Sequence, residues 1–179
     1  MNVNRDLLSF AAPLPGRGMG GHQAAAADSE VWLTPPDLLK ALGPFDLDPC
    51  ACMEPRPWPT AARHYTREDS GLRREWTGRV WLNPPYGGPS IIGPWMRRMA
   101  DHGHGTAIIF ARTETEVFHD CVWNRASAVL FLRGRLHFHH RDGARAKLNA
   151  GAPSCLVAYG DADVAALEAS GLAGKLVRL

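Results

Sequence analysis

The chain lacks the sequence features that would send it into a membrane or out of the cell. It has no run of 18 apolar residues, so we expect no membrane-spanning helix. Its amino terminus has no compact apolar segment, so we expect no secretion signal. Only four of the 179 residues are cysteine, and nothing in their spacing indicates a disulfide framework. We therefore expect free thiols and a reducing, cytoplasmic environment.

The chain also has little excess charge. Its formal net charge is +2, which permits nucleic-acid binding but does not predict it, so a local basic patch would have to carry such binding. The length suits one domain with its own core. Residues 1–28 are rich in glycine, proline and alanine and carry little core signal. We predict a flexible tail over residues 1–28 and a folded domain over 29–179.

Apolar strands alternate with helices along most of the predicted domain. The strands are apolar without strict alternation, as expected when both faces of a sheet are covered. The pattern predicts an α/β sandwich with a largely parallel sheet and helices on both faces. Strands are expected at 45–48, 79–82, 106–111, 128–132 and 154–159, and helices at 36–42, 90–101, 115–125 and 161–170.

Ligands of such sheets bind outside the carboxyl ends of the strands. Asp48, Asn83 and Arg112 each lie at or just past the end of a predicted strand, so we expect one rim to hold all three.

The most informative string is Asn83-Pro84-Pro85-Tyr86, directly after the apolar run 80–82. Each proline fixes φ and removes an N–H group, and it holds the preceding residue extended. The polar groups exposed at this turn are then mostly acceptors, namely the Asn83 amide oxygen and the Pro84 carbonyl. Two such acceptors suit a planar –NH2 group, and Tyr86 offers a flat face for stacking. The alternative interpretation is a purely structural proline turn.

This string resembles the catalytic motif of S-adenosylmethionine-dependent amino-methyltransferases. The amine of adenine is a poor nucleophile because its lone pair is delocalised into the ring. Two acceptors that hold both N–H bonds favour a more tetrahedral nitrogen and direct its lone pair at the methyl donor. In duplex DNA the adenine would have to flip out of the base stack to reach such a site.

Two motifs before this string resemble cofactor-binding elements of the same enzymes. Asp46-Leu47-Asp48-Pro49-Cys50-Ala51 is similar to the opening of their adenosylmethionine motif, in which the acidic residue accepts from the donor's ammonium group. The glycine-rich continuation is replaced by residues 52–54, Cys-Met-Glu. Thr34-Pro35-Pro36 is similar to an element that closes over the methionine end, and it also fits a simple helix N-cap at Thr34.

The order of these motifs, with the segments 63–72, 134–138 and 152–154 and Trp76, resembles the small phage and prophage DNA N-6-adenine methyltransferase family. The resemblance runs from about Glu30 to Gly160. It implies a Rossmann-like fold, S-adenosylmethionine as methyl donor and adenine in DNA as acceptor. The catalytic residues it implies are Asn83, Pro84, Pro85 and Tyr86. The cofactor-binding residues it implies are Thr34, Pro35, Asp46, Asp48, Pro49, Cys50 and, at the nucleoside end, Asp69.

The arginine-rich stretch 133–149 is the best candidate for DNA contacts, although a solvated loop is the alternative for any single arginine. The candidate residues are Arg112, Arg133, Arg135, Arg145 and Lys147. The clustered histidines and the pair Cys50 and Cys52 match no zinc-site spacing, so no metal is expected.

Two alternatives to DNA adenine methylation stay open. The same chemistry can act on RNA or on a protein glutamine. The missing glycines after Asp48 also fit a catalytically degenerate module that binds nucleic acid.

Overall fold

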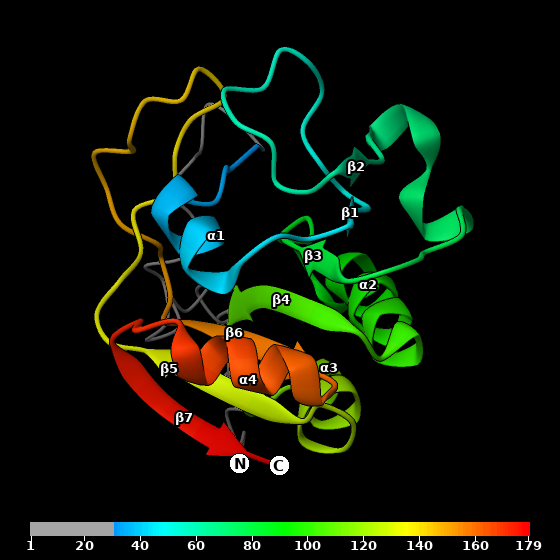
Figure 1. Cartoon of the computed structure of the whole chain (residues 1–179), viewed down its shortest axis with the longest axis vertical. Helices are drawn as coiled ribbons and strands as arrows, with labels where there is room; N and C mark the ends of the chain where they lie inside the picture. The colour runs from blue at the N-terminus through cyan, green and yellow to red at the C-terminus, as the bar shows by residue number, and fades with distance from the viewer. Residues whose placement is uncertain (1–30) are drawn as a thin grey trace, which may run out of the picture.

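The computed structural model describes residues 31–179, which form one mixed sheet with helices on both faces (Figure 1). The predicted tail over residues 1–28 lies outside the described residues. The sheet order is β2-β1-β3-β4-β6-β5-β7. The strands are β1 Leu47–Asp48, β2 Arg63–His64, β3 Val80–Leu82, β4 Gly105–Phe110, β5 Ala128–Leu132, β6 Ser154–Tyr159 and β7 Gly174–Arg178. The helices are α1 Pro36–Leu42, α2 Pro89–His102, α3 Glu116–Phe118 and α4 Asp161–Ala169, with short helical turns η2 Arg67–Asp69, η3 Gly71–Arg73 and η4 His119–Trp123.

The α/β class is confirmed, but the prediction of a largely parallel sheet is wrong for half of the sheet. Strands β2, β1, β3 and β4 pair in parallel. Strand β6 is antiparallel to both β4 and β5, and β7 is antiparallel to β5. The physical reason lies in the connection 133–153, which contains no helix. Parallel neighbours need a connection that crosses from one end of the sheet to the other, usually through a helix. This connection starts and finishes at the same end of the sheet, so β6 runs antiparallel to β5.

Alternate residues of the central strands enter two separate cores. Val80 and Leu82 of β3 pack with α2, α3 and η4, and Trp81 between them packs with α1 and α4 on the other face. The two faces of β4, β5 and β6 are divided in the same way. The prediction of helices on both faces is therefore confirmed, because each face buries its own apolar cluster. None of the helices within residues 31–179 is long and apolar enough to span a membrane.

Two local predictions for helices need correction. Pro35, not Thr34, is the N-cap of α1, and no side chain caps that helix. The predicted helix over 115–125 is a single α turn followed by the π-helical turn η4, in which Asn124 N–H donates to the His119 carbonyl at 3.1 Å. Thr115 caps α3, because its hydroxyl accepts from Phe118 N–H.

The amino ends of the strands are tied together by a buried ion pair. The Arg79 guanidinium donates from Nε to Asp163 Oδ1 of α4 at 2.8 Å and from Nη1 to the Leu42 carbonyl at 2.9 Å. Thr106 donates to the same carboxylate oxygen at 3.0 Å. This cluster holds α1 and α4 against the sheet. The candidate functional residues lie at the opposite edge, where the parallel strands have their carboxyl ends.

Candidate active site at the carboxyl edge of the sheet

The carboxyl ends of β1, β3 and β4 meet at one edge, because these strands are parallel. Asp48 ends β1, Asn83 directly follows β3, and Arg112 lies two residues past β4. The turn after Asp48 and the turn that begins at Asn83 are in contact there, because the Cys50 thiol donates to the Asn83 carbonyl at 3.1 Å. The sequence prediction that one rim holds these three residues is confirmed.

The Asn83 amide has one satisfied side and one unsatisfied side. Its Nδ2 donates to the Trp32 carbonyl at 3.0 Å. Its Oδ1 is buried and has no hydrogen-bond partner within residues 31–179. The sequence predicted that this oxygen would be exposed, whereas the structure shows that it is covered. A buried acceptor without a partner destabilises the fold by about 1–3 kcal/mol, and this oxygen is free to accept from a ligand.

Tyr86 lies beside the same turn as part of an aromatic group. Its ring centroid is 4.5 Å from that of Phe110 and 6.3 Å from that of Phe138. Its hydroxyl donates to the Ile108 carbonyl at 3.4 Å. Burial raises the pKa of Tyr86 well above its usual range, so the phenol stays protonated at neutral pH. Tyr86 therefore contributes an aromatic surface, not a general base.

Three consecutive residues before α1, Trp32–Thr34, connect the parts of the site. The Trp32 carbonyl accepts from Asn83. Leu33 exchanges two backbone hydrogen bonds of 2.9 Å with His139. The Thr34 carbonyl accepts from the Trp58 indole at 3.2 Å. We call these residues the 32–34 segment. It contacts the turn that contains Asn83 (the Asn83 turn), the 133–149 stretch and the loop after β1.

Asp48 is almost fully buried at the end of β1, with 3% exposure. Its Oδ1 accepts from Cys50 N–H at 3.0 Å, and its Oδ2 accepts from the Thr60 hydroxyl at 2.5 Å. Burial raises the pKa of this carboxyl to about 6, although both hydrogen bonds and the charge of Arg56 act in the opposite direction.

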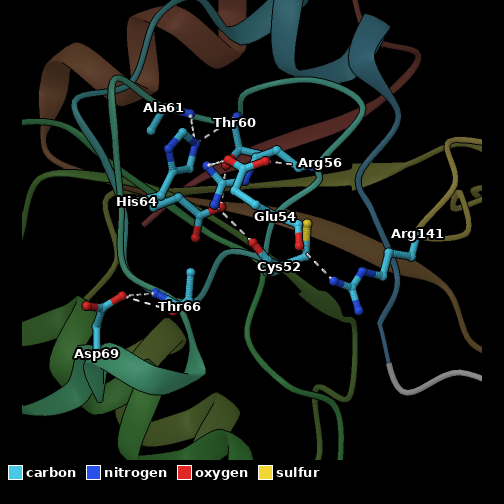
Figure 2. Close-up of polar contacts among 10 residues, drawn as sticks. Cys52, Glu54, Arg56, Thr60, Ala61, His64, Thr66, Asp69 and Arg141 are labelled. Carbon is cyan, nitrogen blue, oxygen red and sulfur yellow. Dashed lines mark hydrogen bonds and ion pairs between the residues drawn. The ribbon is translucent and has the colours of Figure 1, made fainter.

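A compact loop takes the place of the expected glycines after Asp48 (Figure 2). Arg56 lies at its centre, with Nη1 2.8 Å from Glu54 Oε1 and Nη2 donating to the Cys52 carbonyl at 3.1 Å. Arg141 reaches this loop from the 133–149 stretch and donates to the Glu54 carbonyl at 3.0 Å. The loop is therefore built from side chain to backbone contacts, which do not require glycine.

His64 closes the end of this loop (Figure 2). Its Nε2 accepts from Thr60 N–H at 3.2 Å and from Ala61 N–H at 3.3 Å. Burial lowers the pKa of His64, and the charge of Arg56 lowers it further. A neutral His64 ring can accept both hydrogen bonds. His64 therefore holds the backbone of Thr60, whose hydroxyl donates to Asp48.

The groups around Asp48 fit the amino-acid end of S-adenosylmethionine, which carries an ammonium and a carboxylate group. Asp48 supplies a negative charge, and Arg56 supplies a positive charge close to it. Arg56 Nε and the Thr34 hydroxyl are both buried without a hydrogen-bond partner in the described part of the chain. An unused Arg56 donor close to a buried carboxylate fits a zwitterionic ligand.

Two of the predicted cofactor residues have other partners. The Asp69 carboxylate accepts from the Thr66 N–H at 2.8 Å and from its hydroxyl at 2.9 Å, at the start of η2. These bonds lower the pKa of Asp69 (Figure 2). The Asp46 carboxylate accepts from Arg79 N–H at 2.6 Å, at the start of β3 and away from Asn83. The remaining predicted cofactor residues, Thr34, Pro35, Pro49 and Cys50, lie in the 32–34 segment, at the start of α1 or in the turn after β1.

The predicted DNA-contacting residues are spread along the same edge. Arg112 follows β4 and Arg133 follows β5, which points in the same direction as β4. Arg135 and Arg145 line a cavity beside α1, and Lys147 is exposed. Across residues 31–179, no three His, Cys, Asp or Glu side chains are placed to hold a metal ion, and all four cysteines are free.

Arg56 belongs to this edge but was not found from the sequence, and Ser154, which is part of the segment 152–154, was given no role there. Ser154 starts β6 opposite Phe110, is 1% exposed and has a hydroxyl without a hydrogen-bond partner in the described chain. A signal for Arg56 was available, since a charged residue between Pro55 and Pro57 stands out in that loop. The position of Ser154 at this edge could not be predicted, because it depends on the antiparallel pairing of β6.

The fold is of the α/β class with the predicted motifs at one edge of its sheet, and comparison with known families identifies the family. The family model described as DNA N-6-adenine-methyltransferase (Dam) matches residues 21–163, so the chain belongs to this family. A protein of Escherichia phage T1 named DNA N-6-adenine-methyltransferase is 33% identical over 85 residues. That match covers 44% of this chain and 34% of the relative, so the chain spans about a third of the relative's length. No solved structure matches the chain at a significant level.

Proposed function

We propose that the chain is a phage or prophage S-adenosylmethionine-dependent methyltransferase acting on the N6 amine of adenine in DNA. The observation that carries the proposal is the Asn83 amide, whose nitrogen is bound to Trp32 while its buried oxygen has no partner in the described residues. Membership of the DNA N-6-adenine-methyltransferase family supports the choice of acceptor.

In this proposal the chain positions the amine rather than deprotonating it. Asn83 Oδ1 and the Pro84 carbonyl accept its two hydrogens, and Tyr86 with Phe110 supplies the aromatic surface against which the base stacks. Because Asn83 Oδ1 is covered, side chains over the turn must move when a flipped adenine enters. The bond from Asn83 Nδ2 to Trp32 keeps the oxygen directed at the amine.

The methyl donor would be held beside this turn. Asp48 accepts from its ammonium group, and Arg56 and Thr34 donate to its carboxylate. Bound there, S-adenosylmethionine would supply an electrophilic methyl group on its sulfonium sulfur. We also propose that the sheet is a Rossmann-like methyltransferase sheet, since its parallel half ends at the edge that carries both motifs.

The test is transfer of a labelled methyl group to adenine-containing DNA. The Asn83→Ala variant is expected to lose about 100-fold or more in rate, the usual effect of removing one such polar group. Asn124→Ala serves as a matched control, because Asn124 is exposed at the end of η4 and is expected to leave the rate unchanged. An inactive wild-type chain, or a variant as active as the control, would contradict the proposal.

Digestion of the labelled product to nucleosides, followed by mass analysis, distinguishes adenine in DNA from the alternative acceptors in RNA or protein.

A non-catalytic nucleic-acid-binding module is the second candidate function. It is favoured by the loop after β1, because Asp48 already accepts from Thr60 and Cys50. Calorimetric titration with S-adenosylhomocysteine separates the two functions. The proposed enzyme is expected to bind this product, whereas no binding would favour the module.

A further inference from the structure

A cavity of about 380 Å³ lies between the start of α1 and the 133–149 stretch. Figure 1 shows this stretch as the long connection running beside α1. We call this space the arginine cavity; its lining includes Asp37, Arg135, His139 and Arg145.

The lining of the arginine cavity is rich in hydrogen-bond donors and carries excess positive charge. Arg135 and Arg145 supply two guanidinium groups to the lining, and Asp37 supplies one carboxylate. Arg135 is anchored by a bond from Nη1 to the Ala150 carbonyl at 3.0 Å. His139 Nδ1 is buried without a partner in the described chain. Arginine forks match the oxygen geometry of phosphate, so the lining fits a phosphate better than a neutral group.

The arginine cavity is connected to the Asn83 turn through the 32–34 segment. His139 of the cavity pairs with the Leu33 backbone, and Asn83 bonds to the adjacent carbonyl of Trp32. Consecutive Cα atoms are about 3.8 Å apart, so the cavity wall and the Asn83 amide are separated by a distance on the order of 10 Å. That is the scale on which the backbone of a flipped nucleotide lies from its base.

The carboxylate of S-adenosylmethionine is proposed above to be held by Arg56 and Thr34, so the methyl donor does not account for the donors that line this cavity. We propose that the arginine cavity binds a DNA backbone phosphate next to the flipped adenine, with Arg135 and Arg145 donating to its oxygens. The inference rests on the proposed function, because it takes the Asn83 turn as the place where the base is held. Asp37 opposes the anion and limits how much of the backbone can enter.

The first test is the salt dependence of DNA binding, measured by fluorescence anisotropy with an adenine-containing duplex and S-adenosylhomocysteine. In the variant Arg135→Gln with Arg145→Gln, the slope of log K against log salt is expected to be smaller by about 2. The control, Arg73→Gln with Arg97→Gln, removes the same charge from exposed sites on η3 and α2 and is expected to keep the wild-type slope. Equal slopes in both variants would overturn the inference.

The second test removes charge from the DNA instead. Methylphosphonates replace the phosphates flanking every adenine of the duplex. Wild-type affinity is expected to fall at least about tenfold on this DNA, while the affinity of the Arg135→Gln, Arg145→Gln variant is expected to change little. An equal fall for both proteins would overturn the inference. Both arginines are exposed, so the substitutions are expected to leave the fold intact, which thermal unfolding verifies.

These measurements report binding alone and do not require methyl transfer. A reduced salt slope in a chain that methylates nothing would uphold the phosphate site and contradict the proposed function. Normal methylation with unchanged slopes would uphold the proposed function and contradict the phosphate site.

Discussion

Asp48 is an acidic side chain in a place where folding disfavours its charge. It is 3% exposed, and burial raises its pKa to about 6 from an ordinary value near 3.8. At neutral pH the carboxylate is ionised in both the folded and the unfolded chain, so its burial then lowers stability. The proposed function gives this charge a use, because the carboxylate accepts from a cationic ligand.

The Asp48→Asn variant is expected to gain stability relative to wild type as pH rises. Because the folded pKa is raised, wild type is stabilised by proton uptake below about pH 4 and loses this contribution as pH passes 6. Roughly two pKa units correspond to about 3 kcal/mol. The difference in free energy of unfolding, variant minus wild type, should therefore be larger at pH 7.5 than at pH 4 by about that amount.

Urea unfolding at the two pH values measures this difference. A difference that does not change with pH would contradict it. The same variant is expected to bind S-adenosylhomocysteine more weakly.

Single residues could be assigned from the sequence where the chemistry is local. Asn83 and Asp48 follow apolar strands, and their neighbouring prolines mark the turns in which they lie. The contacts that orient them could not be assigned, because the partners are distant in the chain. Trp32 is 51 residues from Asn83, and the thiol of Cys50 bonds to a carbonyl 33 residues away.

At the scale of elements, η3 is packed directly on the turn that follows β1. A Cβ atom added to Gly71 would lie 1.9 Å from the Pro49 carbonyl oxygen, so only glycine allows this approach. Trp76 fixes the other side of Gly71 by donating to its carbonyl at 2.9 Å. The position of the Asp48 turn therefore depends on a residue 23 positions later in the chain.

Gly71→Ala is expected to displace the Asp48 turn or η3. Overpacking of this kind destabilises by about 1–3 kcal/mol, and the affinity for S-adenosylhomocysteine is expected to fall as Asp48 moves. Calorimetry and urea unfolding give the two quantities. Gly88→Ala is the matched control, because nothing lies within 4 Å of its added Cβ. Equal ligand affinities in the two variants would show that the contact does not position the turn.

Most helices and strands could be predicted from apolar patterning, and α1, β5 and β6 have the predicted bounds. Strands β2 and β7 could not, because they lie at the edges of the sheet, where only one neighbour and partial burial shape the sequence. The direction of β6 could not be predicted either. It depends on whether the 133–153 connection crosses the sheet, which apolar patterning does not encode.

At the scale of the whole molecule, the two apolar clusters draw on elements from α1 to β7. All seven strands, from β1 to β7, belong to one sheet. This arrangement is consistent with the predicted domain over residues 29–179, which stays a prediction.

A chain that starts at residue 29 is expected to unfold in one cooperative transition, within a few degrees of the full chain, because both clusters are intact in it. It is also expected to keep S-adenosylhomocysteine affinity. Circular dichroism during heating and calorimetry measure both. Loss of the cooperative transition would place the domain boundary before residue 29.

The 32–34 segment contacts the Asn83 turn, the loop after β1 and the arginine cavity through three successive residues. A ligand that favours one conformation of this segment changes the fraction of molecules whose segment has the conformation that a second ligand binds. Such coupling is reciprocal, so the factor by which DNA alters cofactor affinity equals the factor by which cofactor alters DNA affinity. The order in which the two ligands arrive would then leave the total free energy of the ternary complex unchanged while setting which binary complex accumulates.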